Sequence, residues 1–301
     1  MNRTIRAVAA LVVLLTTPAV AQRGQLISTE ALAALVDRGA VALVDVRQAW
    51  TSYLQGHLPG AVWLHVETLR AGAAGLPFQL LPAEAYARLF DRLGLSARRP
   101  VVVYSAGDQL DVDATFAAWI LEFMGARDVR VLDGGYAKWV LEGRPVSPKF
   151  PRRAAPAGSW VTGTAFRPPV ASLEEVRRAV DGSGALLVDA RPVEQFTGAA
   201  GAQPRRGHIP GAVNHPWKDD LETRDLALVW KDREALRAGY AAQGITPDRD
   251  IILYCNTGTE ATHLFFALRN LLGYPRVRIY LGSWTEWAER EDLPVETGPG
   301  Q

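Results

Sequence analysis

Cysteine is almost absent from this sequence, which has one cysteine, Cys255, among 301 residues. A single cysteine cannot form an internal disulfide, so the stability of the fold must come from the packing of its core. Cys255 is therefore either an inert buried residue or a working thiol. It stands between a run of branched apolar residues and an amphipathic segment.

The sequence also lacks an apolar run long enough to span a bilayer, which takes roughly 20 residues. At the N-terminus, two arginines precede a shorter apolar stretch from Ala7 to Leu15, and a small-residue pattern ends at Ala21. This arrangement is typical of a secretory signal peptide over residues 1–21, and a retained membrane anchor is the alternative. We expect cleavage after Ala21 and export to a bacterial periplasm or to the exterior, with no membrane contact after cleavage.

A strong charge of either sign is missing as well. The formal net charge is +1, and removal of residues 1–21 lowers it to −1, because that segment holds two arginines and no acidic residue. Such a balance gives no reason to expect nucleic acid or an anionic membrane as a partner. Five histidines and one cysteine show no metal-ligand spacing, so we expect no metal and no other cofactor.

What the sequence does contain is an internal repeat. Four segments recur in the same order: LVDVR (43–47) as LVDAR (187–191), GHLPGAV (56–62) as GHIPGAV (207–213), VVVY (101–104) as IILY (251–254), and VRVLDGGYAKW (129–139) as VRIYLGSWTEW (277–287). Such a repeat predicts two copies of one globular domain. We expect the domains over residues 22–149 and 171–301, joined by a linker over 150–170 that is rich in Pro, Gly and Ala.

The pattern within each copy predicts a three-layer α/β domain. Short apolar runs that end in Asp45 and Asp189 suit strands buried on both faces, and amphipathic stretches at 84–93 and 234–243 suit helices. Strands that alternate with helices indicate a mostly parallel sheet flanked by helices. We expect Trp160, in the linker, to be held against a domain surface.

Cys255 directly follows the predicted strand IILY, at the edge of a parallel sheet where functional loops gather. The loop continues with Asn256, Thr257, Gly258, Thr259 and Glu260, and a predicted helix follows. Backbone N–H groups of this Cys255 loop (residues 255–260) and the helix N-terminus favour a thiolate and can stabilise an anionic sulfur. We therefore expect Cys255 to titrate below about 8.5, the ordinary thiol value, and a buried structural cysteine is the alternative.

Other cysteine chemistries fit the sequence poorly. A cysteine-dependent phosphatase needs an arginine six positions after the cysteine to clamp the phosphate, and Ala261 stands there. Peroxide reduction or disulfide exchange usually requires a second, resolving cysteine. A cysteine protease would need a base, and His263 follows the loop, but the strand–loop–helix layout does not support such a site.

The motifs LVDAR, GHIPGA, YCNTGTEA and LGSWTEW in a duplicated α/β chain resemble the tandem-domain rhodanese family of sulfurtransferases, over nearly all of the chain after residue 21. The resemblance implies transfer of sulfur from a donor such as thiosulfate or 3-mercaptopyruvate, through a persulfide on Cys255, to cyanide or a thiol. It also implies one catalytic domain. The residues agree, because Ser105 stands opposite Cys255 in the first copy, and a hydroxyl without a base is a poor sulfur acceptor.

Two departures from the family pattern concern the donor. Many catalytic members carry an arginine where Gln195 stands, six positions after Asp189, and the Cys255 loop matches neither the thiosulfate-preferring nor the mercaptopyruvate-preferring pattern. Glu260 would repel a dianion unless its side chain turns to the helix surface. These features leave open a second function, a sulfur or selenium carrier dedicated to a partner protein, with little turnover of small donors.

Several residues outside the loop are further candidates. Those for binding the donor are Asp189, Arg191, Gln195, Arg206 and Trp284. Asp45 and Asp189 end their strands, so we interpret them first as acceptors of backbone N–H bonds that fix loops and second as direct participants in the chemistry. His57 and His208 occur in both copies, including the copy without a cysteine, and are interpreted as structural.

Overall fold

The structure is a computed structural model that describes residues 25–73, 76–107, 112–151, 158–161, 165–182 and 184–300. The predicted signal peptide, its cleavage site at Ala21 and part of the predicted linker lie outside the described residues. Within the described part of the chain, no helix is both long enough and apolar enough to cross a membrane.

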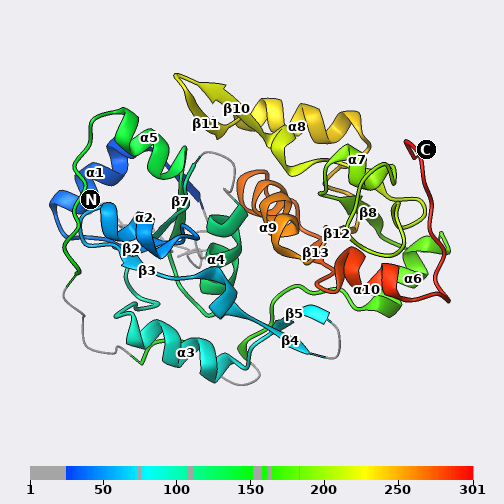
Figure 1. Cartoon of the computed structure of the whole chain (residues 1–301), viewed down its shortest axis with the longest axis horizontal. Helices are drawn as coiled ribbons and strands as arrows, with labels where there is room; N and C mark the ends of the chain where they lie inside the picture. Colours follow the sequence, from blue (N-terminus) through cyan, green and yellow to red (C-terminus); the bar gives the residue numbers. More distant parts are fainter. Residues whose placement is uncertain are drawn as a thin grey trace, which may run out of the picture.

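The first domain is built on a five-stranded parallel sheet with the strand order β1-β7-β6-β2-β3. Its strands are β1 (Gln25–Ile27), β2 (Ala42–Asp45), β3 (Val62–Trp63), β6 (Val101–Tyr104) and β7 (Val129–Leu132). Its helices are α1 (Thr29–Asp37), α2 (Trp50–Gln55), η1 (Val66–Leu69), α3 (Ala83–Arg92), α4 (Val112–Phe123) and α5 (Gly135–Leu141). β2 and β6 are fully buried, because helices cover both faces of the sheet (Figure 1).

The second domain repeats this plan with a four-stranded parallel sheet in the order β13-β12-β8-β9. Its strands are β8 (Leu186–Asp189), β9 (Val213–Asn214), β12 (Ile251–Tyr254) and β13 (Val277–Ile279). Its helices are α6 (Leu173–Val180), α7 (Val193–Phe196), η3 (Trp217–Asp220), α8 (Arg233–Ala242), α9 (Thr259–Phe265), η4 (Phe266–Leu271) and α10 (Ser283–Glu289). The two parallel sheets flanked by helices confirm the predicted fold class.

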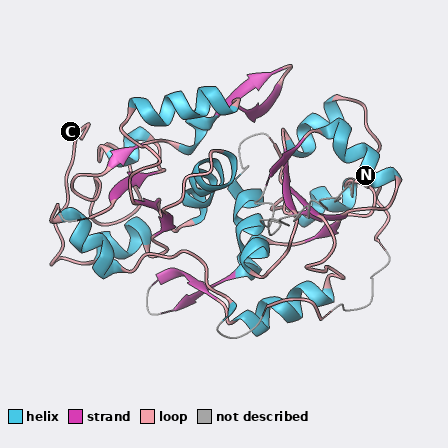
Figure 2. Ribbon diagram, turned by 180° about the vertical axis from the view of Figure 1, so that it is seen from behind, coloured by secondary structure: helices cyan, strands magenta, loops and turns pink. Residues whose placement is uncertain are grey.

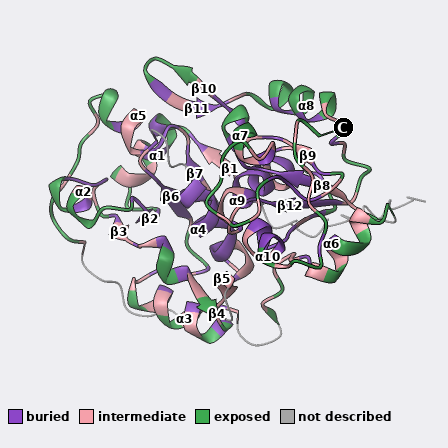
Figure 3. Ribbon diagram, turned by 45° about the vertical axis from the view of Figure 1, so that its right-hand side comes forward, coloured by how far each residue is buried: buried purple, intermediate pink, exposed green. Residues whose placement is uncertain are grey.

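The two domains meet along α4 and α9, which pack against each other at the centre of the molecule (Figures 1 and 2). One continuous cluster of buried apolar side chains runs through both domains, from Val103 of β6 to Leu253 of β12. The Oγ1 atoms of Thr115 and Thr262 lie 3.2 Å apart across this contact. In Figure 3 the buried strands and central helices form a single interior, so the domains share a core.

Each domain also carries an antiparallel hairpin that the sequence analysis did not predict. The first hairpin pairs β4 (Arg70–Ala73) with β5 (Leu76–Leu80), and the second pairs β10 (Leu221–Arg224) with β11 (Ala227–Trp230). Each reaches the other domain, since β5 contacts α10 and β11 contacts α5. The backbone N–H of Trp230 donates to Asp133 Oδ1 at 3.0 Å, across the domain boundary.

The described part of the linker follows the first domain before it enters the second. Trp160 is buried, and its ring lies 4.9 Å from that of Phe90 on α3. Val170 then pairs in parallel with Ile279, beside β13, where the first domain has β1 beside β7. The linker therefore ends as an edge of the second sheet.

Candidate active site

Cys255 is the first residue after β12, at the carboxyl end of a central strand of the second sheet. Gly258 takes the left-handed conformation, with φ of 85°, and is the residue directly before α9. This bend turns the Gly258 N–H toward the sulfur, and it donates to Cys255 Sγ at 3.1 Å. A residue without Cβ adopts such a conformation without strain, which explains why glycine stands here.

The first domain covers this loop. A Cβ atom built on Gly258 would lie 2.6 Å from Cδ1 of Phe78, which belongs to the first hairpin. Cys255 itself is only 1% exposed. The thiol is thus enclosed by a loop of one domain and a hairpin of the other.

Burial raises the pKa of Cys255 to about 12, and the nearby charge of Glu260 adds to the rise. Backbone N–H groups of Ala261, Thr257 and Glu260 act in the opposite direction and stabilise the thiolate. The prediction that Cys255 titrates below about 8.5 is therefore wrong for this structure. Its donors are present, but loss of hydration outweighs them in so enclosed a site.

Glu260 faces the sulfur rather than the helix surface. Its Oε2 is buried, without a hydrogen-bond partner among the described residues. Burial raises the pKa of Glu260, and the contact with the Cys255 thiol opposes that rise. The alternative in which this side chain turns to the helix surface is therefore wrong, because it interacts with Cys255 and its Oε2 is buried. A carboxyl group beside a thiol can exchange a proton with it.

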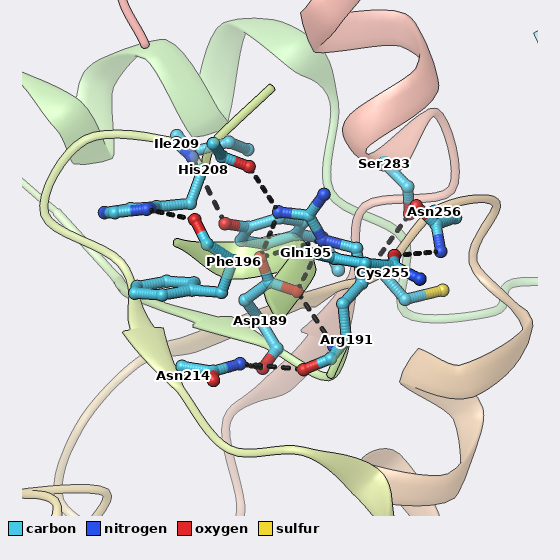
Figure 4. Close-up of polar contacts among 12 residues, drawn as sticks. Asp189, Arg191, Gln195, Phe196, His208, Ile209, Asn214, Cys255, Asn256 and Ser283 are labelled. Atoms are coloured by element: carbon cyan, nitrogen blue, oxygen red, sulfur yellow. Dashed lines mark hydrogen bonds and ion pairs between the residues drawn. The ribbon is translucent and has the colours of Figure 1, made fainter. Parts of the chain in front are cut away.

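Gln195 lies against the Cys255 loop. Its Oε1 accepts a hydrogen bond of 2.8 Å from Asn256 Nδ2 (Figure 4). Gln195 belongs to the short helix α7, which follows β8 at the same sheet edge. Gln195, which stands where many catalytic family members have an arginine, is therefore in direct contact with the loop.

Asp189 and Arg191 form a buried ion pair beside the loop, with Arg191 Nη2 2.6 Å from Asp189 Oδ2 (Figure 4). The Arg191 backbone N–H donates to Asp189 Oδ1 at 2.9 Å, and Nη2 also donates to the carbonyl of Gly207 at 2.8 Å. Asp45 and Arg47 form the same pair in the first domain, at 2.7 Å. Because the domain without the cysteine has the same ion pair, we interpret the pair as structural. The Arg191 guanidinium already binds Asp189 and the Gly207 carbonyl, so it is poorly placed to bind a donor.

The two remaining candidates, Trp284 and Arg206, have no described hydrogen bond to the sulfur. Trp284 is buried, and the guanidinium carbon of Arg191 lies 4.7 Å from the centre of its ring. Its backbone N–H donates to the carbonyl of Cys255 at 2.9 Å, so it supports the loop from the core side. Arg206 is exposed, next to the turn that holds Gly198, and no described contact joins it to the Cys255 loop.

The histidines of the repeated turn have the same role in both domains. His57 Nδ1 lies 2.9 Å from the carbonyl oxygen of Tyr53, and His208 Nδ1 lies 2.8 Å from that of Phe196. Both side chains are fully buried. They fasten the turn to the helix before it.

The equivalent place in the first domain holds Ser105, directly after β6 and 1% exposed. Asp113, near the start of α4, accepts a hydrogen bond from Gln48 Nε2 at 3.3 Å. Burial raises the pKa of Asp113 to about 6. Asp108 and Asp111, the two acidic residues between Ser105 and Asp113, lie outside the described residues.

Three residues at the loop were not predicted from the sequence: Phe78 beside Gly258, Ser283, whose Oγ accepts from the Cys255 N–H at 3.2 Å, and Arg70 of the first hairpin. Its Nη1 donates to Thr259 Oγ1 at 3.0 Å and to Thr257 Oγ1 at 3.3 Å. No local motif marks Arg70, because it is far from Cys255 in the sequence. A search of the described residues for three or more His, Cys, Asp or Glu side chains placed to hold a metal finds none.

Comparison with known proteins agrees with this arrangement. The sequence profile of the rhodanese-like domain matches residues 28–142 and 172–290. The chain is 33% identical to the 3-mercaptopyruvate sulfurtransferase of Escherichia coli K12 over 284 residues, which are 88% of this chain and 95% of that protein. It is 34% identical to the sulfur carrier protein TtuD of Thermus thermophilus over 287 residues, 91% of this chain and 96% of that one.

A solved structure supports the fold. The crystal structure of YnjE superposes with a TM-score of 0.78 at 24% identity, over 91% of this chain and 68% of that one. Both domains match the family profile, and the relatives align over almost their whole length, so the family of the chain is clear. The chain belongs to the rhodanese family, as a sulfurtransferase with two rhodanese-like domains in tandem.

Proposed function

We propose that Cys255 takes up sulfur from a small donor, thiosulfate or 3-mercaptopyruvate, and passes it on from a persulfide. The observation that carries this proposal is the Gly258 N–H, which donates to Cys255 Sγ at 3.1 Å, within a loop whose other N–H groups also favour negative sulfur. Such donors stabilise charge that develops on sulfur during the transfer. The same loop also carries the hydroxyls of Thr257 and Thr259.

With thiosulfate, the sulfur of Cys255 attacks the outer sulfur of the donor. The S–S bond of thiosulfate breaks, sulfite leaves with the bonding electron pair, and Cys255 becomes a persulfide. Because the pKa of Cys255 is raised, its proton must leave as the new bond forms, and the Glu260 carboxylate is in contact to receive it. An acceptor thiolate or cyanide then takes the outer sulfur and releases Cys255.

Mass spectrometry tests the intermediate. Incubation with donor and no acceptor should add the mass of one sulfur atom to the peptide that holds Cys255, and later addition of cyanide should remove it. A protein that turns over donor while Cys255 stays unmodified would exclude the persulfide route.

A carrier that serves one partner protein is the second candidate. Gln195 and Glu260 favour it, because neither supplies positive charge for a small anionic donor. The similarity to a sulfur carrier protein supports it as well. Rapid formation of the persulfide with negligible turnover of cyanide or small thiols would favour the carrier, and fast turnover would favour the enzyme.

We also propose that the protein is exported and that residues 1–21 are removed. The basic start, the apolar stretch and the small residues before Gln22 support this proposal. Expression in a bacterial host tests it, since the mature protein in the periplasm should begin at Gln22. Full-length protein that stays in the cytoplasm would contradict export.

A further inference from the structure

We propose that Arg70, from the domain without the cysteine, holds the anionic end of the sulfur donor at the Cys255 loop. The group that it would bind is an oxyanion, either the sulfonate of thiosulfate or the carboxylate of 3-mercaptopyruvate. This inference rests on the proposed function of Cys255 and assigns the donor-binding cation for it.

The position of Arg70 is the first argument. Its Nη1 reaches Thr257 Oγ1 at 3.3 Å and Thr259 Oγ1 at 3.0 Å, the hydroxyls on either side of Gly258. Gly258 is the residue whose N–H donates to the sulfur. The guanidinium therefore lies at the part of the loop where a donor joined to Cys255 through its outer sulfur would carry its oxyanion.

The charges around the loop are the second argument. Residues 256–260 contain no cation, and Gln195 stands where an arginine would have reached the loop. Arg191 is 1% exposed and bound to Asp189 and to a backbone carbonyl. Of the described residues outside the loop, Gln195 and Arg70 hydrogen-bond to its side chains, and of these two Arg70 carries a positive charge. A dianion that enters this enclosed place requires such a charge.

The bonds of Arg70 leave room for a ligand. It pairs with Glu67, which is 53% exposed, and its own side chain is 18% exposed. A surface ion pair of this kind contributes little to stability. The two bonds of Nη1 go to neutral hydroxyls, which a sulfonate or carboxylate oxygen can replace with a stronger, charge-assisted bond.

The second domain provides an internal comparison. Arg70 directly follows the turn η1 and pairs with Leu80 in the first hairpin, and Leu221 directly follows η3 and pairs with Trp230 in the second. The same place in the same fold thus accepts leucine. The hairpin does not need an arginine there, which separates the role of Arg70 from the folding of β4 and β5.

The experiment compares Arg70→Met and Arg70→Lys with the wild type, using thiosulfate and 3-mercaptopyruvate separately. Arg224→Met is the matched control, because Arg224 lies on the second hairpin and pairs with Glu222. We expect Arg70→Met to raise KM by about tenfold or more, as for the loss of a charge-assisted contact, with a smaller change in kcat. Arg70→Lys should recover part of the loss, and Arg224→Met should change neither constant.

The two donors distinguish the two oxyanions. A rise in KM for thiosulfate alone assigns the sulfonate, a rise for 3-mercaptopyruvate alone assigns the carboxylate, and either supports the proposal. An unchanged KM for both would overturn it. An equal loss of kcat in Arg70→Met and Arg70→Lys, with lower thermal stability and no effect on KM, would also overturn it. Arg70 would then serve to hold the two domains together.

A binding measurement keeps this inference separate from the proposed function. Calorimetric titration of thiosulfate into Cys255→Ser protein, with and without Arg70→Met, needs no turnover. If the wild type transfers no sulfur but Arg70 still determines thiosulfate binding, the proposed function fails and this inference stands. If the wild type transfers sulfur and binding is indifferent to Arg70, this inference fails.

Discussion

Cys255 and Ser105 occupy the same place in two copies of one fold, directly after the strands β12 and β6. Sulfur accepts a sulfane atom readily, whereas a hydroxyl without a base does not. Cys255→Ser should therefore abolish sulfur transfer and leave the circular dichroism spectrum unchanged, while Ser105→Ala should keep nearly full turnover. Comparable losses in the two variants, in a thiosulfate-to-cyanide assay, would contradict a single active domain.

The pKa of Cys255 gives a second prediction at the residue scale. Glu260 raises this pKa by charge repulsion, so Glu260→Gln should lower it and increase the rate of iodoacetamide alkylation at pH 8. Each unit of decrease corresponds to about a tenfold increase in the thiolate fraction. Burial remains the larger cause, so the alkylation midpoint of the wild type should lie above about 8.5.

Glu234→Gln serves as the control, because Glu234 lies in the first turn of α8 but is exposed. A wild-type midpoint at or below about 8.5 would show that the N–H donors outweigh burial in solution. The same raised pKa affects stability. Between about 8.5 and about 12 the unfolded thiol loses its proton first, so the free energy of unfolding should fall as pH rises through this range.

At the scale of elements, the junction of the Cys255 loop with α9 depends on Gly258. Gly258→Ala would place a Cβ 2.6 Å from the buried ring of Phe78 and would force alanine into φ of 85°. The conformation alone costs about 1–2 kcal/mol, and the clash must move either the loop or the first hairpin. We expect activity to fall by at least tenfold, since the N–H beside the sulfur moves with the loop.

Gly239→Ala is the matched control for this prediction. Gly239 lies within α8, and nothing stands within 4 Å of its added Cβ. Alanine there should raise the free energy of unfolding by about 0.5–1 kcal/mol, as expected in the interior of a helix. Thermal unfolding and turnover of both variants provide the measurement, and normal activity of Gly258→Ala would mean that the loop tolerates displacement.

At the scale of the molecule, the shared core predicts that the domains unfold together. Trp119 of α4 is 2% exposed, and its ring lies 6.3 Å from that of Phe265 on α9. Trp119→Ala should lower the free energy of unfolding by about 3–5 kcal/mol, as for other buried tryptophans. Because the variant weakens the core of both domains, unfolding in urea should remain one transition.

Two probes measure this directly. Far-UV circular dichroism follows the whole chain, and the reaction of Cys255 with a thiol reagent follows the second domain alone. The two urea curves should coincide. Reactivity of Cys255 at a urea concentration where most of the circular dichroism signal persists would indicate domains that unfold independently.

Much of this architecture could be predicted from the sequence. The repeated segments identified two domains, the apolar runs became the central strands, and the amphipathic stretches at 84–93 and 234–243 became α3 and α8 to within one residue. These features are local, because burial on both faces of a sheet imposes its pattern on each strand separately. Placing Cys255 at the strand end required only the order of residues along the chain.

The tertiary structure decided what surrounds the sulfur. Arg70 and Phe78 come from the other domain, and only the packing of the first hairpin on the Cys255 loop brings them there. The same packing helps to bury the thiol, and burial, with the nearby charge of Glu260, reverses the predicted shift of the pKa of Cys255. A loop sequence determines which N–H donors are available, but hydration depends on every element packed around the loop. For that reason the sequence identified Cys255 as the nucleophile. It could not determine the protonation of Cys255 or the position of Arg70 at the loop.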